Sequence, residues 1–533
     1  MPALAFPTAR DGSWPKLSTK PNIGRPEPDF VQQSSTDIWQ AVCASVREVL
    51  TKAGIDSADV EGLGFDATCS LVVLDAEDRP VSVSPNGEAD QNIIMWMDHR
   101  ATTEAEEINT QGHEVLRYVG GRISPEMQTP KILWLKRHLP EAYEKAANFF
   151  DLPDYLTFRA TDDRSRSLCS TVCKMTYLGH EAADQEDTVG RWDTSYFEQI
   201  GLEDFVTDDF VRLGQRVRPV SEALGNGLTE EAATDLGLKS GTAVSVSLID
   251  AHAGGVGMLG LSLNDEEKVD FDKRIALIGG TSSCHMAVSS KARFIDGIWG
   301  PYYSAMVPNL WLSEGGQSAV GSLIDHLIFG HKASTKMRAA AKAEGLSPYA
   351  WLNQRVTHLT EGMNLPAELA KDLHVDPDFH GNRSPRADAS LKGTILGMGM
   401  SATVDDLVKL YLATVDALAY GTRQIIECMN TQGYQIETII MCGGHIKNEL
   451  FLQEHADVTS CRIVIPSEPE SVLLGSAMLG AVAAGKYPDI PAAMAAMSQP
   501  GKIINPNTQA KDFHDRKYEA FHKMHELQIE LRN

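Results

Sequence analysis

The chain has 533 residues, enough for two to four domains with a large buried core. Its composition, 43% hydrophobic and 23% charged, excludes an intrinsically disordered chain, a collagen and a coiled coil. The net charge of −24 at pH 7 repels nucleic acid and anionic membranes, so any phosphate-bearing ligand has to be held by local groups.

The cysteines and the N-terminal segment indicate the compartment. The eight cysteines are sparse and contain no Cys-x-x-Cys pair, which is typical of reduced, buried thiols in a cytoplasmic protein. Residues 1–16 have no continuous apolar run, and nowhere do about 18 uncharged apolar residues follow one another. We therefore expect neither a secretion signal nor a membrane span.

Helix and strand signals alternate in the first half of the chain. Ser34 and Asp37 form a capping-box pattern ahead of apolar residues at three-and-four spacing, which predicts an amphipathic helix. Residues 71–74 predict an apolar strand, and residues 244–248 predict a buried strand that leads into Asp250 and a run of glycines.

The second half repeats this alternation. Apolar strands are predicted at 275–278 and 438–442, each ending in glycines, with a long amphipathic helix at 404–430 between them. This mixture predicts an α/β protein.

The polar segment 264–268 separates two glycine-rich apolar regions and is the best candidate for a domain boundary. We therefore expect one domain over residues 1–264 and a second over residues 265–533.

Asp250 is the leading candidate for chemistry. An isolated carboxylate at the end of an apolar strand either caps the next helix or acts as a base, and the glycines that follow favour the base. His252 is better interpreted as a packed histidine. Lys174 lies between Cys173 and Met175, where an ordinary solvated lysine is not expected.

Two strand ends carry glycine pairs. The segment GGTSS at 279–283 offers unobstructed backbone N–H groups and three hydroxyls, which suit phosphate oxygens. Gly443 and Gly444 would let the flat base and ribose of a nucleotide lie against the backbone. Taken alone, each segment is equally consistent with a plain turn.

These segments, read in order, resemble the FGGY family of carbohydrate kinases from about residue 30 to the C-terminus. The motifs that carry the resemblance are GFDATCS at 64–70, MWMDHRA at 95–101, FDLPD at 150–154, SLCS at 167–170, IDAHAGG at 249–255, GGTSSCH at 279–285, EGGQS at 314–318, HGNRSP at 380–385 and CGG at 442–444. The resemblance implies two actin-like, ribonuclease H-like domains around a central cleft, with sugar bound mainly by the first and ATP mainly by the second.

The resemblance also implies roles for individual residues. It makes Asp250 the catalytic base that takes a proton from the sugar hydroxyl. The other implied positions are Ala67, Trp96, Lys174 and Glu314 on the sugar with Gln317 nearby, Gly280 and Thr281 on the ATP phosphates, and Gly443, Gly444 and Asn448 on the adenosine.

The implied reaction is phosphorylation of a ketopentose by ATP with Mg²⁺, with D-ribulose converted to D-ribulose 5-phosphate. The expected partners are a small-molecule sugar and ATP, with neither nucleic acid nor membrane, and a homodimer is left open. Two alternatives stay open as well: a catalytically impaired kinase that binds sugar for regulation, and a kinase for another pentulose, a hexulose or a polyol such as glycerol.

One departure from the family concerns the first phosphate loop. The family's first domain normally begins with a strand, an Asp-x-Gly-Thr hairpin whose aspartate helps to hold magnesium, and a second strand. Here the resemblance starts after that second strand, and residues 1–10 contain no aspartate, glycine or serine. We leave the metal ligands unassigned and expect an upstream segment to encode the hairpin and its two strands.

Without this loop we expect the chain to have little kinase activity and reduced stability, because a magnesium ligand or its anchor is lost. The measurement is the rate of D-ribulose phosphorylation by this chain beside a chain extended with such a segment. Equal rates would show that the first loop is dispensable.

Overall fold

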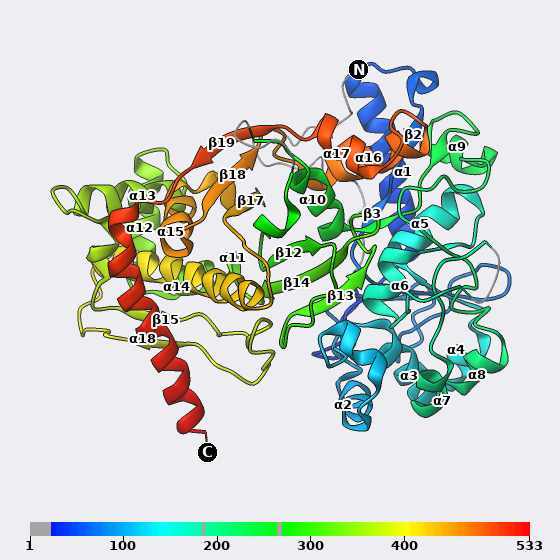
Figure 1. Ribbon diagram of the computed structural model, residues 1–533, viewed down its shortest axis with the longest axis horizontal. Coiled ribbons are helices and arrows are strands. Elements are labelled where there is room, and N and C mark those ends of the chain that lie inside the picture. Colours follow the sequence, from blue (N-terminus) through cyan, green and yellow to red (C-terminus); the bar gives the residue numbers. More distant parts are fainter. Residues whose placement is uncertain (1–22, 184–186, 264–268, 533) are drawn as a thin grey trace.

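The computed structural model describes residues 23–183, 187–263 and 269–532. Figure 1 shows two lobes, the first half of the chain (residues 23–263) on the right and most of the second half (residues 269–532) on the left. The expected boundary segment 264–268 and the N-terminal residues 1–22 lie outside the described residues, so the predicted domain boundary stays a prediction.

The first half contains short strands and ten α-helices within its described residues. The strands are β1 (Gln32–Gln33), β2 (Gly62–Leu63), β3 (Asp66–Ala67), β4 (Leu71–Leu74), β5 (Ile93–Ile94), β6 (Asn148–Asp151), β7 (Arg166–Ser167), β8 (Val217–Arg218), β9 (Ala243–Val244) and β10 (Leu248–Ile249). The helices are α1 (Ser35–Ala53), α2 (Thr102–Gln111), α3 (Gln128–His138), α4 (Pro140–Lys145), α5 (Leu152–Thr161), α6 (Leu168–Lys174), α7 (Thr194–Gln199), α8 (Glu203–Thr207), α9 (Glu230–Leu236) and α10 (Asp250–Leu259).

Strand pairing in the first half is antiparallel in one sheet and parallel beside it. Strands β1, β5, β4 and β6 form an antiparallel sheet in that order, whereas β2 pairs with β9 and β3 pairs with β10 in parallel. The predicted helix is confirmed as α1, whose N-cap Ser34 accepts a hydrogen bond from the Asp37 amide (3.3 Å). The strand predicted at 71–74 is confirmed as β4.

The single strand predicted at 244–248 is wrong, because β9 ends at Val244 and β10 begins at Leu248. Between them Ser245 forms an isolated bridge with Ala223, and the Val246 amide donates to the Glu222 carbonyl (2.8 Å). These bonds draw the backbone away from regular pairing, so two short strands replace one.

The second half is built on one mixed sheet. Its strands are β11 (Arg274–Gly279), β12 (Ser283–Ser289), β13 (Trp299–Tyr303), β14 (Trp311–Gln317), β17 (Thr438–Gly443), β18 (Arg462–Pro466) and β19 (Pro500–Ile504), in the order β13-β14-β12-β11-β17-β18-β19, with a separate hairpin of β15 (His374–Asp376) and β16 (Thr394–Leu396). The helices are α11 (Gly321–Gly330), α12 (Ser334–Ala343), α13 (Pro348–Leu359), α14 (Val404–Thr431), α15 (Glu449–Thr459), α16 (Ser471–Ala483), α17 (Ile490–Met497) and α18 (Lys511–Glu530).

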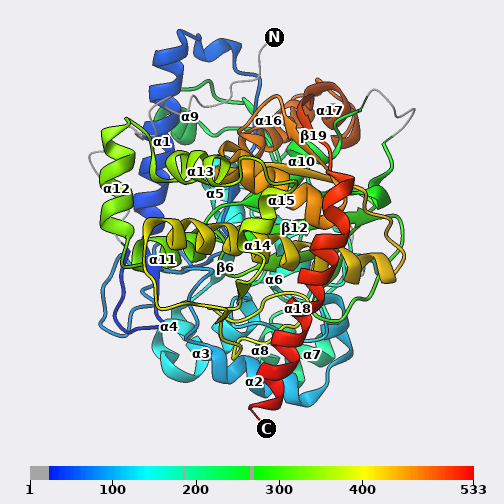
Figure 2. The same ribbon diagram turned by 90° about the vertical axis from the view of Figure 1, so that its left-hand side faces the viewer.

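The elements predicted in the second half are confirmed as β11, β17 and α14. Strand β17 pairs in parallel with β11 and β18, so the glycines that end β11 and β17 meet at one edge. Figure 2 shows α18 crossing the outer face next to α14 and α15. None of the described helices is both long and apolar enough to cross a membrane.

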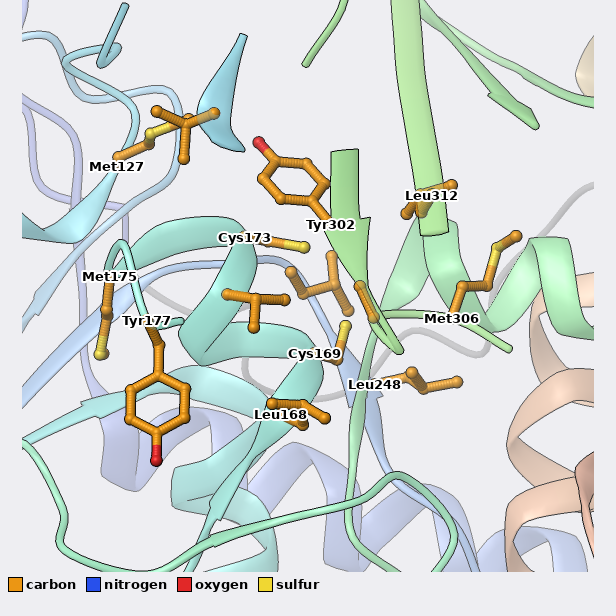
Figure 3. Packing of buried hydrophobic residues seen from close by; sticks show 14 of the residues in the cluster. Met127, Leu168, Cys169, Cys173, Met175, Tyr177, Leu248, Tyr302, Met306 and Leu312 are labelled. Carbon is orange, nitrogen blue, oxygen red and sulfur yellow. The ribbon is translucent and has the colours of Figure 1, made fainter. Parts of the chain in front are cut away.

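One hydrophobic core runs through both halves, from Leu71 of β4 to Val464 of β18. Figure 3 shows part of it, where α6 packs near Tyr302 of β13 and Met306. Trp134 and Trp351, which the sequence predicts to be core residues, are both buried.

Helix α10 of the first half and α16 of the second half pack so closely that their backbones are in contact. A Cβ atom at Gly257 would lie 1.9 Å from the Ser471 carbonyl oxygen, and one at Gly475 would lie 1.9 Å from the Ala253 carbonyl oxygen. Such distances leave room for hydrogen only. Glycines at both positions therefore let the two halves join through their helix backbones.

Helix α16 also lies against the first half at β2 and the residue that follows it. A Cβ atom at Gly64 would be 2.0 Å from the Ser476 carbonyl oxygen, and one at Gly62 would be 2.2 Å from the Gly480 carbonyl oxygen. In Figure 1 the orange α16 accordingly lies over the blue β2. These contacts fix where β3 meets the second half.

We expect Gly64→Ala to lower the free energy of unfolding by about 1 to 3 kcal/mol, because the new methyl group overlaps the backbone of α16. Thermal and urea unfolding measure the change. Gly330→Ala is the matched control, since a Cβ atom at Gly330 meets nothing within 4 Å. Equal stability of both variants would contradict the tight contact between α16 and the strand.

Candidate functional site

Asp250 lies where the two halves meet. Strand β10 pairs in parallel with β3 so that Ile249 stands beside Ala67, which brings Asp250 next to the β3 strand end. Asp250 is the first residue of α10, and its Oδ1 accepts a hydrogen bond from the Ala251 amide (2.7 Å). Burial raises the pKa of Asp250, although the Ala251 amide and the Lys174 ammonium act to lower it.

Asp66, in the neighbouring strand β3, supplies a second carboxylate. Burial raises its pKa to about 6; a hydrogen bond from Ser476 of α16 opposes the rise and the charge of Asp250 adds to it. The two strands thus present a pair of carboxylates that repel one another.

Lys174 and Glu314 are buried groups from different halves whose charges act on each other. Lys174 ends α6 and is only 4% exposed, and within the described residues its ammonium donates no hydrogen bond. Glu314 lies in the middle of β14, and its Oε2 is buried without a hydrogen-bond partner in the described part of the chain. The prediction that Lys174 is not an ordinary solvated lysine is confirmed.

Burial and neighbouring charges act in opposite directions on the pKa values of Lys174 and Glu314. Burial acts to lower the pKa of Lys174, but Cys69 and Glu314 raise it well above its usual value. Burial also raises the pKa of Cys69, to about 12, so this thiol is neutral near pH 7. Burial raises the pKa of Glu314 as well, while Lys174 and Arg383 lower it.

A hydrogen bond ties Trp96 to Ser70, three residues after Ala67. The Trp96 amide donates to Ser70 Oγ (3.2 Å), and Ser70 immediately precedes β4, a few residues after Ala67. The Trp96 carbonyl accepts from Lys131 Nζ (3.4 Å). Ala67 and Trp96 are partly buried, and like Lys174 they belong to the first half of the chain.

Gln317 differs from the other residues predicted to bind the sugar, because its side chain bonds to α14. Its Nε2 donates to the Leu418 carbonyl (3.0 Å) and to Thr422 Oγ1 (3.1 Å), both on α14. The amide nitrogen is therefore occupied inside the second half. Its predicted contact with the sugar stays a prediction that these hydrogen bonds do not support.

The glycine loops after β11 and β17 lie side by side. Gly279 pairs with Gly443, whose φ of +91° and whose contact with the Gly279 carbonyl (2.2 Å from a Cβ position) both require glycine. Gly280 and Thr281 are exposed, and a Cβ atom at Gly444 would meet nothing within 4 Å. The edge is therefore free to receive a ligand.

The Gly280–Thr281 turn rests on the start of α11. The Thr281 carbonyl accepts from the Val320 amide (2.8 Å), and the Gly280 carbonyl accepts from the Gly321 amide (3.1 Å). Gly254, one turn after Asp250, has only 3.2 Å between its Cβ position and Ile278 of β11. Asp250 and this turn therefore lie at the same end of the junction.

Asn448, predicted to contact adenosine, caps α15. Its Oδ1 accepts from the Phe451 amide (3.2 Å) and from Asn353 Nδ2 (2.9 Å), and its Nδ2 donates to Tyr411 Oη (2.8 Å). These bonds give Asn448 a structural role at the edge that carries Gly443 and Gly444. Its contact with a nucleotide stays a prediction.

His252 is a packed histidine, as predicted. It is 1% exposed, its Nε2 lies 3.5 Å from Cys173 Sγ, and burial lowers its pKa to about 3. With Cys169 and Cys173 it forms a group of three buried ligand atoms within 4.8 Å of one another, the one such group in the described part of the chain. Sulfur and nitrogen ligands do not suit Mg²⁺, which prefers oxygen.

Three residues with no assigned role also reach this site. Trp299 of β13 pairs with Glu314, and its ring lies 5.2 Å from Lys174 Nζ and 5.6 Å from the Arg383 guanidinium carbon. Glu126 of the first half lies 3.8 Å from Arg383. Arg383 belongs to the HGNRSP motif, whereas nothing in the local sequence signals Trp299 or Glu126.

Chemically, the junction combines three features. The partly buried carboxylate of Asp250 stands at the start of α10, two cations and two carboxylates lie around the Trp299 ring, and the two glycine turns form an exposed edge of the sheet. Carbohydrates present C–H faces to aromatic rings and hydroxyls to charged groups, and glycine turns accept phosphates.

Comparisons with known proteins give the family and the fold. The N-terminal domain of the "FGGY family of carbohydrate kinases" matches residues 16–257, and the C-terminal domain of the same family matches residues 275–484. The FGGY carbohydrate kinase domain-containing protein of Homo sapiens is 50% identical over 511 residues, 95% of this chain and 91% of that protein. The D-ribulokinase YDR109C of Saccharomyces cerevisiae is 42% identical over 483 residues, 86% of this chain and 67% of that protein.

Solved structures confirm the fold. The xylulose kinase from Rhodospirillum rubrum superposes with a TM-score of 0.76 at 19% identity, covering 96% of this chain and 93% of that one. The Plasmodium falciparum glycerol kinase with ADP superposes with a TM-score of 0.72 at 14% identity, covering 95% and 92%. The expected α/β architecture of two actin-like, ribonuclease H-like domains is therefore confirmed, and this chain belongs to the FGGY family of carbohydrate kinases.

Proposed function

We propose that the protein is an ATP-dependent D-ribulokinase that converts D-ribulose to D-ribulose 5-phosphate. The observation that carries the proposal is the position of Asp250 at the start of α10: β10 lies beside β3, the charge of Lys174 reaches Asp250, and Gly254 packs against β11 just before its glycine turn. The 42% identity with a yeast D-ribulokinase supports the choice of sugar. Ribulokinases of Bacillus licheniformis and Geobacillus thermodenitrificans, each 29% identical, support it further.

Lys174 and Glu314 would hold the sugar. The ammonium donates no hydrogen bond in the described structure and Glu314 Oε2 accepts none, so both have capacity for sugar hydroxyls. Leaving buried charged groups unsatisfied costs free energy, which a bound polyol recovers. Trp96, joined to the β3–β4 turn through Ser70, would cover the sugar from the first half.

Asp250 would accept the proton of the attacking hydroxyl. Its burial raises the basicity of the carboxylate, and the position at the start of α10 holds it in place through the Ala251 amide. The γ-phosphate of ATP would lie at the Gly280–Thr281 turn, with the adenosine against Gly443 and Gly444. In-line placement of the hydroxyl and the phosphate supplies most of the rate enhancement in such reactions.

Asp66 fits a magnesium ion. The charge of Asp250 contributes to the raised pKa of Asp66, and a divalent cation with oxygen ligands relieves such repulsion. We propose the Asp66 carboxylate as the group that would hold Mg²⁺, which when bound neutralises phosphate charge and leaves Asp250 free to act as the base.

The two alternatives are weaker. An impaired, purely sugar-binding protein is favoured by the missing first phosphate loop, but it would not need Asp250 and an exposed glycine turn together, and both are in place. An experiment distinguishes D-ribulose from another pentulose, a hexulose or a polyol as the substrate. ADP release by the purified protein is measured with each member of a panel of ketoses and polyols. D-Ribulose should give the highest kcat/KM, and a higher value for another sugar would overturn the substrate assignment.

We expect Asp250→Asn to retain D-ribulose binding while turnover falls by roughly two to four orders of magnitude, the usual contribution of general base catalysis. Steady-state kinetics and calorimetric titration give the two quantities. Asp489→Asn is the matched control, because Asp489 also accepts an amide hydrogen bond at a helix start, from Ala492 (2.8 Å). A variant that keeps more than a tenth of the turnover would remove Asp250 from the role of base.

We expect Lys174→Ala and Glu314→Gln to weaken D-ribulose binding by roughly 10- to 150-fold, since each removes a charge-assisted hydrogen bond. The affinity for ATP should change less than twofold, because both glycine turns, Gly280–Thr281 and Gly443–Gly444, are intact. Calorimetric titration measures both affinities. Lys136→Ala is the control: it breaks an ion pair with Asp204 (2.8 Å) in the first half and should leave the affinities for D-ribulose and ATP unchanged. Unchanged D-ribulose affinity in Lys174→Ala and Glu314→Gln would contradict sugar binding by these residues.

A further inference from the structure

Arg383 is a partly buried arginine without a hydrogen bond in the described part of the chain. Its side chain is 15% exposed, yet within the described residues its guanidinium donates to no acceptor. The loop that carries it is braced: Asn382 Nδ2 donates to Asp378 Oδ1 (2.8 Å), and Arg386 Nη1 donates to Asp378 Oδ2 (2.8 Å). A hydrogen-bonded loop thus presents five N–H donors for which the described residues supply no acceptor.

The aliphatic part of the Arg383 side chain directs the guanidinium toward the residues proposed to bind the sugar. Its Cδ lies 3.2 Å from the Cβ position of Gly316, two residues after Glu314 on β14. From there the guanidinium carbon reaches 5.6 Å from the centre of the Trp299 ring. Lys174 reaches the same ring at 5.2 Å, so two cations from opposite halves flank Trp299.

Glu126 of the first half faces Arg383 across the junction. The distance from Glu126 Oε1 to Arg383 Nη2 is 3.8 Å, close enough for attraction but too long for a hydrogen bond. Burial acts to raise the pKa of Glu126, but His99, Arg383 and Lys174 lower it to about 2, so the carboxylate is ionised. His99 Nε2 also lies 3.4 Å from Glu126 Oε1.

Lys131 fixes Glu126 relative to Trp96. Its ammonium is fully buried and donates to the carbonyls of Met95 (2.8 Å), Trp96 (3.4 Å) and Glu126 (3.2 Å). The backbone that presents Glu126 is therefore tied to the backbone that presents Trp96. The first half offers Arg383 a carboxylate in a defined place.

We propose that Arg383 is a further sugar-binding residue, supplied by the second half, and that Glu126 is the positioning residue that holds its guanidinium over the site. This inference rests on the proposed function, since the ligand it contacts is the sugar. The guanidinium would donate to sugar oxygens from the side opposite Lys174, and the ion pair with Glu126 would keep it there when the site is empty.

The test is calorimetric titration of D-ribulose and of ATP into wild type, Arg383→Gln, Arg383→Lys, Glu126→Gln and the Arg383→Gln/Glu126→Gln double variant. We expect Arg383→Gln to weaken D-ribulose binding at least tenfold with ATP binding within twofold, and Arg383→Lys to recover part of the loss. Glu126→Gln should weaken sugar binding severalfold, and the double variant should match Arg383→Gln alone. Glu107→Gln, which breaks the Glu107–Arg137 ion pair (2.7 Å) within the first half, is the control and should bind as wild type does.

Sugar affinity of Arg383→Gln within twofold of wild type would overturn the role of Arg383. A loss in the double variant equal to the product of the single losses would overturn positioning by Glu126. If Arg383→Gln unfolds at a lower temperature, the nearly isosteric Glu126→Gln and the charge-preserving Arg383→Lys decide the question.

A second readout does not depend on the sugar. The emission of Trp299, isolated as the difference between a protein and its Trp299→Phe variant, should shift when Glu126→Gln frees the guanidinium and should stay unchanged in Glu107→Gln. An unchanged Trp299 spectrum in Glu126→Gln would overturn the positioning role whatever the substrate is. Wild-type protein that binds none of the panel sugars would overturn the proposed function, and this spectrum would still decide the Glu126–Arg383 relation.

Discussion

The rest of the structure depends on the backbone contact between α10 and α16. Gly257 and Gly475 bring the two helices so close that neither position has room for a methyl group. Because α10 begins with Asp250 and packs through Gly254 on β11, this single crossing sets the distance between the carboxylate and the glycine edge of the second half. Phosphoryl transfer is sensitive to such placement, since positioning and electrostatics supply nearly all of its catalysis.

The charges at the junction form a second constraint. Lys174, Arg383, Glu314 and Glu126 lie around Trp299. Taking ions out of water is costly, and the Arg383–Glu126 pair at 3.8 Å without a hydrogen bond recovers only part of that cost. In the proposed function, the hydroxyls of a sugar would supply the missing hydrogen bonds without adding charge.

The two halves contribute different groups to the proposed site. The first half supplies the carboxylates at strand ends and the anchored backbone around Trp96, fixed by Lys131 and Ser70. The second half supplies the glycine turns and the braced loop of Arg383. The proposed site takes residues from both halves, so substrate affinity and the packing of the halves would be coupled.

The sequence by itself determined the α/β class, the helices α1 and α14, the strands β4, β11 and β17, and Asp250 with the two glycine turns. Periodicity, capping residues and strand-end glycines are local signals, and the motif order indicated the family. The tertiary structure alone decided which side chains meet. It showed that Gln317 bonds to α14 and Asn448 caps α15, that residues 244–248 split into two strands, and that Glu126, Trp299 and Arg383 gather around Lys174. Local patterns report which face of an element is buried but carry no information on what it faces across a junction, because those contacts join residues far apart in the chain.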